Sequence, residues 1–271
     1  MELPRRISTR QLNIERNRPR NELMIVGTAE FRRIGPFTID VIGPTTEAVE
    51  DLEARWRKWL GRSQKALRRL QAEMLEDEKR LSGLDAGRLP DPRLDTALGE
   101  GTITAPNLAS LVLLIKDESG STILPTGDGS SEDILTGLGQ CEKLDDNGTV
   151  HVDILKVQHH GAEANVTEDF VNRVGADHSV FCGNGARHNP EKSVVAAMVK
   201  ARLGVGGERI GPNTPFTFWF TSAGDTPGLS APRKEHMTEL EDLVETMATA
   251  NDPTGRFSYH FLTKGHHTIE I

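Results

Sequence analysis

The stretch from Asp153 to Val166, DILKVQHHGAEANV, decides how the rest of the sequence is interpreted. An apolar run of strand length stops at His159 and His160, and Gly161 follows them. Two adjacent histidines after a strand can belong to an ordinary turn. They can also be half of a metal site, because imidazole nitrogen is a common zinc ligand.

Strands and helices are expected to alternate on both sides of this stretch. Apolar runs typical of strands lie at 108–117, 121–125, 150–157, 178–183 and 216–222, and helical spacing of apolar residues appears at 130–140, 167–175, 191–204 and 236–250. Residues 257–271 are expected to end the chain as a hairpin. This alternation predicts an α/β fold in one domain.

The first part of the chain shows a different pattern of apolar and polar residues. Residues 23–43 predict two short strands around a Gly-Pro turn, and residues 46–82 predict one long or two shorter amphipathic helices. We therefore expect a domain over 23–271 with a helical excursion at about 46–82. Residues 1–22 are interpreted as a basic N-terminal arm, because residues 1–33 hold eight arginines against four glutamates. Such an arm is either a solvated tail or a contact to nucleic acid.

Composition excludes several classes of protein. A formal net charge of −8 is unlike that of a passive nucleic-acid coat protein, which carries a basic excess. Two cysteines are too few for a disulfide framework. The sequence has no apolar run long enough to span a membrane, and its first residues do not form a secretory signal, so we expect a cytoplasmic protein without a membrane partner.

Polar residues suited to chemistry follow three of the predicted strands. Asp128 lies between two glycines, His159 and His160 follow the next strand, and a loop that contains Asn184 and His188 follows the third. Loops beyond strand ends in α/β sheets collect ligand sites. Each residue alone fits a turn, but the three loops together indicate a zinc-type site made of a carboxylate and imidazoles.

Three segments carry a resemblance to a known family. They are ILPTGDGSSEDIL (123–135), VDILKVQHHGAEANVTEDFV (152–171) and ADHSVFCGNGARHNP (176–190). In this order they resemble the ComEC-type branch of the metallo-β-lactamase fold, which includes the hydrolase domain of DNA-uptake competence proteins. The resemblance implies an αββα sandwich, a zinc or manganese centre, and hydrolysis of phosphodiesters by metal-activated water.

The resemblance also implies roles for individual residues. Asp128 matches the aspartate that bridges the metals, and His159 matches a metal-binding histidine. His160 and His188 are the candidates for proton transfer in catalysis. Three secondary positions complete the expected site: Asn107 and Ser110, which fall on a polar N-x-x-S element, and Asn184 in the glycine loop.

One departure from the family pattern is large. The family's main metal-binding segment, a His-x-His-x-Asp-His motif, lies early in the domain, whereas all nine histidines of this sequence lie at or after His151. The chain therefore resembles the C-terminal two-thirds of the domain, a partial sandwich with an incomplete metal site. It is a fragment of an active hydrolase, half of a split enzyme, or a degenerate member that acts as an interaction module.

These explanations imply different partners. An active hydrolase would act on nucleic acid or another phosphodiester. A split enzyme would be completed by a complementing chain or by a second copy in a homo-oligomer. A degenerate subunit would have no activity of its own.

Overall fold

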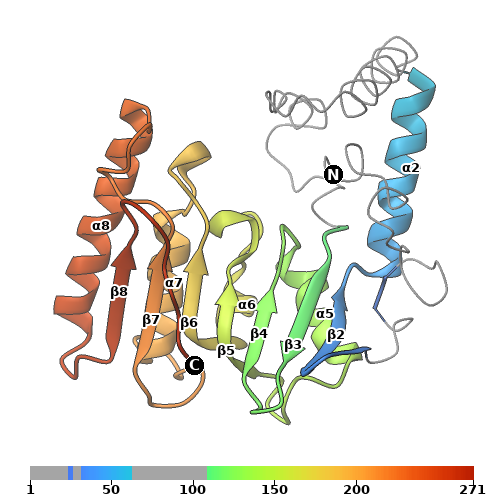
Figure 1. The fold of residues 1–271 in the computed structure, drawn as a ribbon, viewed down its shortest axis with the longest axis horizontal. Coiled ribbons are helices and arrows are strands. Elements are labelled where there is room, and N and C mark those ends of the chain that lie inside the picture. The colour runs from blue at the N-terminus through green and yellow to red at the C-terminus, as the bar shows by residue number, and fades with distance from the viewer. Residues whose placement is uncertain (1–23, 27–31, 63–108) are drawn as a thin grey trace.

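The chain has an α/β fold built on one eight-stranded mixed sheet (Figure 1). It was analysed as a computed structural model, which describes residues 24–26, 32–62 and 109–271. Five helices lie within these residues, none of them both long and apolar enough to cross a membrane. The predicted α/β class is thus confirmed.

The strands are β1 Arg32–Ile34, β2 Phe37–Gly43, β3 Val112–Lys116, β4 Thr122–Pro125, β5 Val150–Lys156, β6 Val174–Phe181, β7 Phe216–Phe220 and β8 Phe257–Phe261. The helices are α2 Thr46–Arg62, α5 Ser131–Gln140, α6 Glu168–Val171, α7 Lys192–Leu203 and α8 Ala231–Asn251. Two 3₁₀ turns are η2 Gln158–Gly161 and η3 Ala186–His188.

The strands follow one another across the sheet in sequence order. Pairs from β1 to β4 are antiparallel, and pairs from β4 to β8 are parallel. Each parallel pair is joined by a crossover that contains a helix, as such pairs require. The carboxyl ends of β4 to β8 therefore lie along one edge of the sheet, at the top of Figure 1.

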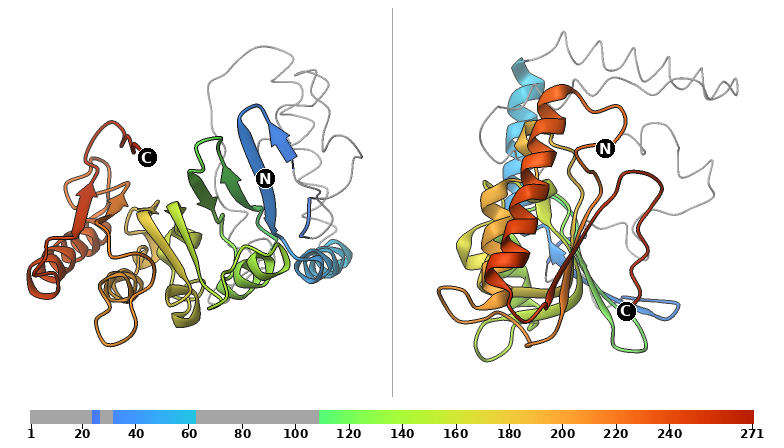
Figure 2. Two further views of the ribbon diagram at one scale, coloured as in Figure 1. Left: turned by 90° about the horizontal axis from the view of Figure 1, so that it is seen from below. Right: turned by 90° about the vertical axis from the view of Figure 1, so that its left-hand side faces the viewer.

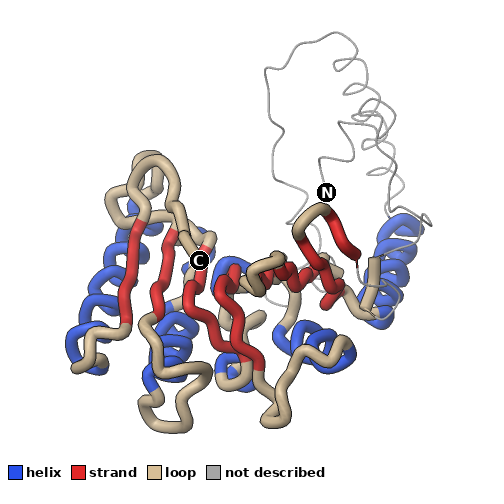
Figure 3. Tube along the Cα trace, turned by 60° about the horizontal axis from the view of Figure 1, so that its bottom comes forward, coloured by secondary structure: helices blue, strands red, loops and turns tan. Residues whose placement is uncertain are grey.

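All five helices lie on the same side of the sheet (Figures 2 and 3). The core between the helices and the sheet is rich in phenylalanine, because β7 places Phe216, Phe218 and Phe220 at alternate positions toward the helices and β6 adds Phe181. Its largest fully buried side chains include Phe170, Phe181, Phe216, Phe218, Phe220, Leu124, Ile134, Leu138, Leu155, Met237 and Leu240.

The opposite face of the sheet carries a row of isoleucines. Ile39 pairs with Ile115, Ile115 with Ile123, and Ile123 with Ile154, so the four side chains lie side by side across four strands. Their chain neighbours Leu124 and Leu155 are fully buried under the helices, so the row points away from them. Among the described residues, this half-buried apolar row has no helix over it.

The helical stretch expected over 46–82 begins as α2 and is described as far as Arg62. Its remainder, residues 63–82, and the basic arm at 1–22 lie outside the described residues. The two short strands expected within 23–43 are β1 and β2, joined by a turn at Gly35 and Pro36.

The expected hairpin over 257–271 was wrong. β8 pairs in parallel with β7 instead, and its alternate residues Phe257 and Phe261 stack on Phe216 and Phe220 with ring centroids 5.1 and 4.2 Å apart. This stacking stabilises β8 against β7, so the strand needs no antiparallel partner from the tail that follows it. The following tail crosses the other face of β7, where the His267 Nε2 lies 3.0 Å from the Phe220 carbonyl (Figure 1).

Candidate functional site

The three predicted polar loops lie at the carboxyl edge of the parallel strands. Residues 126–129 follow β4, η2 follows β5, and residues 182–189 follow β6. These strands are neighbours in the sheet, so their loops are neighbours as well. The interpretation of QHHG as an ordinary turn is weakened by this convergence.

Ser110, Asp128 and His159 come together at this edge. The Asp128 N–H donates to the Ser110 Oγ at 3.2 Å, and the His159 N–H donates to the Gly127 carbonyl at 3.1 Å. A Cβ on Gly127 would lie 3.0 Å from the Ser110 Cβ, and its φ of 57° is also unfavourable for other residues. Glycine at 127 therefore lets the Asp128 turn approach Ser110 closely.

Asn165 is a central residue that the sequence analysis missed. Its side chain is fully buried, and its Oδ1 lies 2.5 Å from the His159 Nδ1. Its Nδ2 donates to the carbonyls of Asp128 and Gly129, at 3.0 and 3.2 Å. Because the amide oxygen accepts the Nδ1 proton, Nε2 is the His159 nitrogen suited to bind a metal. One amide thus orients both predicted metal ligands.

Lys156 was also missed, although a lysine that ends an apolar strand is a signal visible in the sequence. Its Nζ donates to the Gly127 carbonyl at 2.6 Å and lies 4.0 Å from the Asp128 Oδ1. Burial lowers the pKa of Lys156 below its usual range, and the Asp128 carboxylate opposes that shift. The Lys156 amine thus lies close enough to Asp128 for the charged form to attract its carboxylate.

His160 and Asn184 lie on the β6 side of the same edge. The His160 Nδ1 is 2.9 Å from the Cys182 carbonyl, to which it donates. The Asn184 Oδ1 accepts the Ala186 N–H at 3.2 Å. The two residues line a shared pocket next to the His159 turn.

The other two predicted positions lie apart from these contacts. The His188 ring packs edge-on against the His236 ring of α8, with centroids 5.4 Å apart. Asn107 lies outside the described residues.

The backbone at this edge is unusual. His159, His160, Arg187 and His188 have φ values between 44° and 62°, in the left-handed region that non-glycine residues rarely adopt. Each such residue costs about 1–3 kcal/mol unless its surroundings compensate, and such residues cluster at functional sites. The strained turns thus support a functional edge, independently of the residue types.

The residues present do not by themselves fit a complete metal centre. A catalytic zinc takes three protein ligands and one open position. Among the described residues, no group of three or more His, Cys, Asp and Glu side chains is placed to hold a metal ion. Asp128 and His159 are therefore two candidate ligands of an incomplete set.

A second polar cluster lies toward the other end of the parallel strands. The Asp177 Oδ1 is 3.0 Å from the His151 Nε2 and 3.5 Å from the Arg202 Nη2. Arg202 also donates to the carbonyls of Ala176, Ile210 and Pro212 at 2.8–3.1 Å. Burial lowers the pKa of Arg202 to about 10. We interpret this cluster as structural, because Arg202 anchors the segment between α7 and β7.

The partly buried position of His151 predicts that the free energy of unfolding depends on pH. Burial lowers the pKa of His151 below 6.5, although Asp177 opposes the shift, so the unfolded chain binds the proton more readily than the folded chain. The free energy of unfolding should therefore fall as pH decreases from about 7 to about 5. Urea unfolding should show a smaller fall for His151→Gln than for the exposed control His266→Gln. Equal falls in the free energy of unfolding of the two variants would show that His151 does not cause the pH dependence.

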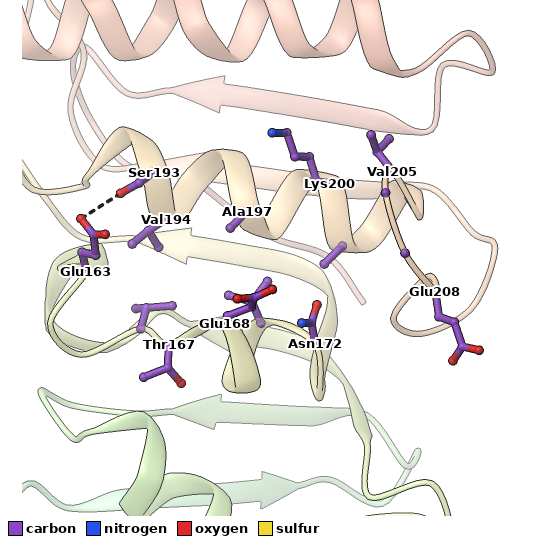
Figure 4. A pocket seen from close by; sticks show the side chains of 15 residues that line it. Glu163, Thr167, Glu168, Asn172, Ser193, Val194, Ala197, Lys200, Val205 and Glu208 are labelled. Atoms are coloured by element: carbon purple, nitrogen blue, oxygen red, sulfur yellow. Dashed lines mark hydrogen bonds between the residues drawn. The ribbon is translucent and has the colours of Figure 1, made fainter.

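A second hollow lies between α6 and α7, on the side of the sheet that the helices cover (Figure 4). Its volume of about 640 Å³ is larger than that of the pocket lined by His160 and Asn184. Val194 and Ala197 belong to its lining, and the Ser193 Oγ donates to Glu163 at 3.3 Å. No histidine or cysteine lines this hollow. It therefore offers no imidazole or thiolate ligand for zinc.

Comparisons of this chain with protein-family models, with curated proteins and with solved structures find no match.

Proposed function

We propose that this chain is part of a metal-dependent hydrolase of the metallo-β-lactamase type that acts on phosphodiesters. In this proposal its two-layer unit is one half of an αββα sandwich, and Asp128 and His159 are one half of a zinc or manganese site. The remaining ligands come from elsewhere in the chain or from a complementing chain. Among the described residues, no third His, Cys, Asp or Glu side chain is grouped with Asp128 and His159 to hold a metal ion.

The observation that carries the proposal is the buried amide of Asn165. It holds the His159 ring through Nδ1 and the Asp128 loop through two carbonyls. Metal-binding histidines are commonly oriented in this way by an acceptor at the other ring nitrogen. A turn without such a function would not need both residues fixed by one buried group.

The helices add a favourable field for a phosphate. α5, α7 and α8 each follow a loop from the carboxyl edge of the parallel strands, so their N-termini open toward that edge. The N-terminus of a helix carries a partial positive charge and suits anions. Together with the Lys156 ammonium group, this field supports an anionic substrate.

Metal binding by the purified chain tests the proposal. Zinc content after dialysis should be below one equivalent and should fall further in Asp128→Ala and His159→Ala, because each removes one of two ligands. Asp146→Ala, at an exposed aspartate, is the control and should leave the zinc content unchanged. Atomic emission measures the metal, and bis(p-nitrophenyl) phosphate measures hydrolysis with and without a candidate complementing chain.

One result would contradict metal binding by Asp128 and His159. Zinc below about a tenth of an equivalent, equal in the parent chain and all three variants, would mean that Asp128 and His159 bind no metal. Activity that appears only when two chains are mixed would instead support the split enzyme.

A second candidate function is a subunit without activity of its own, which acts as an interaction module. The row of isoleucines on the helix-free face favours it, because among the described residues no helix covers this apolar row. Association without zinc binding or hydrolysis, measured by sedimentation, would support this candidate over the hydrolase.

A further inference from the structure

A small pocket of about 350 Å³ lies beyond the carboxyl ends of β5, β6 and β7. It lies next to the His159 turn, because His160 forms part of its wall. Its volume falls within the range of small-molecule sites. The residues that line it are His160, Cys182, Gly183, Asn184, Ala186, Asn189, Thr221 and Ser222.

The lining combines apolar surface with hydrogen-bonding groups. It contains no Asp, Glu, Lys or Arg side chain. Burial raises the pKa of the Cys182 thiol, so this group stays neutral as well. The His160 Nδ1 donates to the Cys182 carbonyl, so Nε2 is the ring nitrogen left for a ligand. A charged ligand group would find no partner of opposite charge in these walls.

Two further groups at the pocket are ready to form hydrogen bonds. Asn189 is 8% exposed, and its buried Oδ1 has no hydrogen-bond partner among the described residues. A buried acceptor without a donor is unfavourable, and rotation of the amide would present this oxygen to a ligand. Ser222 is slightly more buried, at 6% exposed, and its hydroxyl makes no hydrogen bond with the described part of the chain. The pocket is thus rich in unused acceptors.

We propose that this pocket binds a nucleoside, the uncharged arm of a phosphodiester substrate whose phosphate lies at the Asp128–His159 edge. A nucleoside supplies the N–H and O–H donors that the Asn189 oxygen, the His160 Nε2 and the Ser222 hydroxyl accept. Walls that combine apolar surface with hydrogen-bonding groups suit a base with an apolar face and polar edges, and the lack of Lys and Arg disfavours a second phosphate. The position of the phosphate rests on the proposed function, whereas binding of the nucleoside does not.

Nucleoside binding can be measured without metal or hydrolysis. Adenosine, guanosine, cytidine and thymidine are titrated separately into the ¹⁵N-labelled full chain, and amide shifts are followed by NMR. We expect saturable shifts at Cys182, Gly183 and Asn184 with at least one nucleoside. Ser222→Ala should weaken this binding roughly fivefold, because one hydrogen bond is lost.

A second variant fills the pocket without removing a hydrogen bond. Ala186→Leu places a larger side chain on the lining and should abolish the saturable shifts. Ser258→Ala, on exposed β8, is the matched control and should bind like the parent chain. Urea unfolding of each variant shows whether it is folded.

Three results would each overturn the proposal that the pocket binds a nucleoside. Absence of saturable shifts with all four nucleosides, or binding that both Ala186→Leu and Ser222→Ala leave unchanged, overturns it. Equal affinity for ribose alone also overturns it, because the base would then contribute nothing. Hydrolysis of bis(p-nitrophenyl) phosphate, which contains no nucleoside, reports on the metal site separately, so the two proposals fail independently.

Discussion

Asn165→Ala should lower the free energy of unfolding by about 2–4 kcal/mol, a large effect for one side chain. The fully buried amide bonds the His159 ring and donates to the carbonyls of Asp128 and Gly129. Removing it takes away the acceptor at the His159 Nδ1 and the donor to the carbonyls of Asp128 and Gly129, and it opens a small cavity. Urea unfolding followed by circular dichroism measures the change.

The matched control for this prediction is Asn172→Ala. Asn172 is exposed at the end of α6, and its side chain makes no hydrogen bond within the described residues. Its replacement should change stability by less than about 0.5 kcal/mol. Zinc binding gives a second readout for Asn165→Ala, because the variant lacks the acceptor that orients the His159 Nδ1. A variant as stable as the parent chain would show that the amide does not hold the two loops.

Gly137→Ala should destabilise the fold even more strongly, by at least about 3 kcal/mol. Gly137 lies in α5 where the helix crosses β2, and a Cβ there would come within 1.8 Å of the Ile42 carbonyl oxygen. Both sides of this contact are backbone, so neither can rotate away. The helix would have to separate from the sheet, with loss of core packing around Ile42 and Leu138.

Gly139→Ala in the same helix is the control. A Cβ at Gly139 meets only the Leu144 Cδ1 at 3.8 Å, an ordinary contact. Alanine is favoured over glycine in a helix by up to about 1 kcal/mol, so this variant should be as stable as the parent chain or more so. Thermal unfolding compares the two variants directly. If Gly137→Ala unfolds like Gly139→Ala, α5 does not lie against β2 as the structure has it.

The element order could be predicted because local signals were strong. Ser130 and Asp133 have the spacing of a helix capping box, and in the structure the Ser130 hydroxyl accepts the Asp133 N–H at 3.1 Å. The apolar runs around Leu114, Leu124 and Leu155 form strands as expected. Such signals depend on neighbours a few residues apart, so the sequence alone contains them.

The end of the chain could not be predicted in the same way. The pattern over 257–271 fits a hairpin, but β8 gains more by stacking Phe257 and Phe261 on Phe216 and Phe220 of β7. That partner lies some forty residues earlier in the chain. A choice between strand partners is a property of the assembled core, so local periodicity does not contain it.

By itself, the sequence determined the α/β alternation, the three polar loops and the absence of any histidine before His151. Only the tertiary structure decided which groups act on one another. It placed Asn165 between Asp128 and His159, put Lys156 beside the same carboxylate, and left Asn189 with an unsatisfied oxygen at a pocket wall. Residue types and spacing follow from the chain, whereas hydrogen bonds between separate loops exist only once the sheet sets the loops side by side.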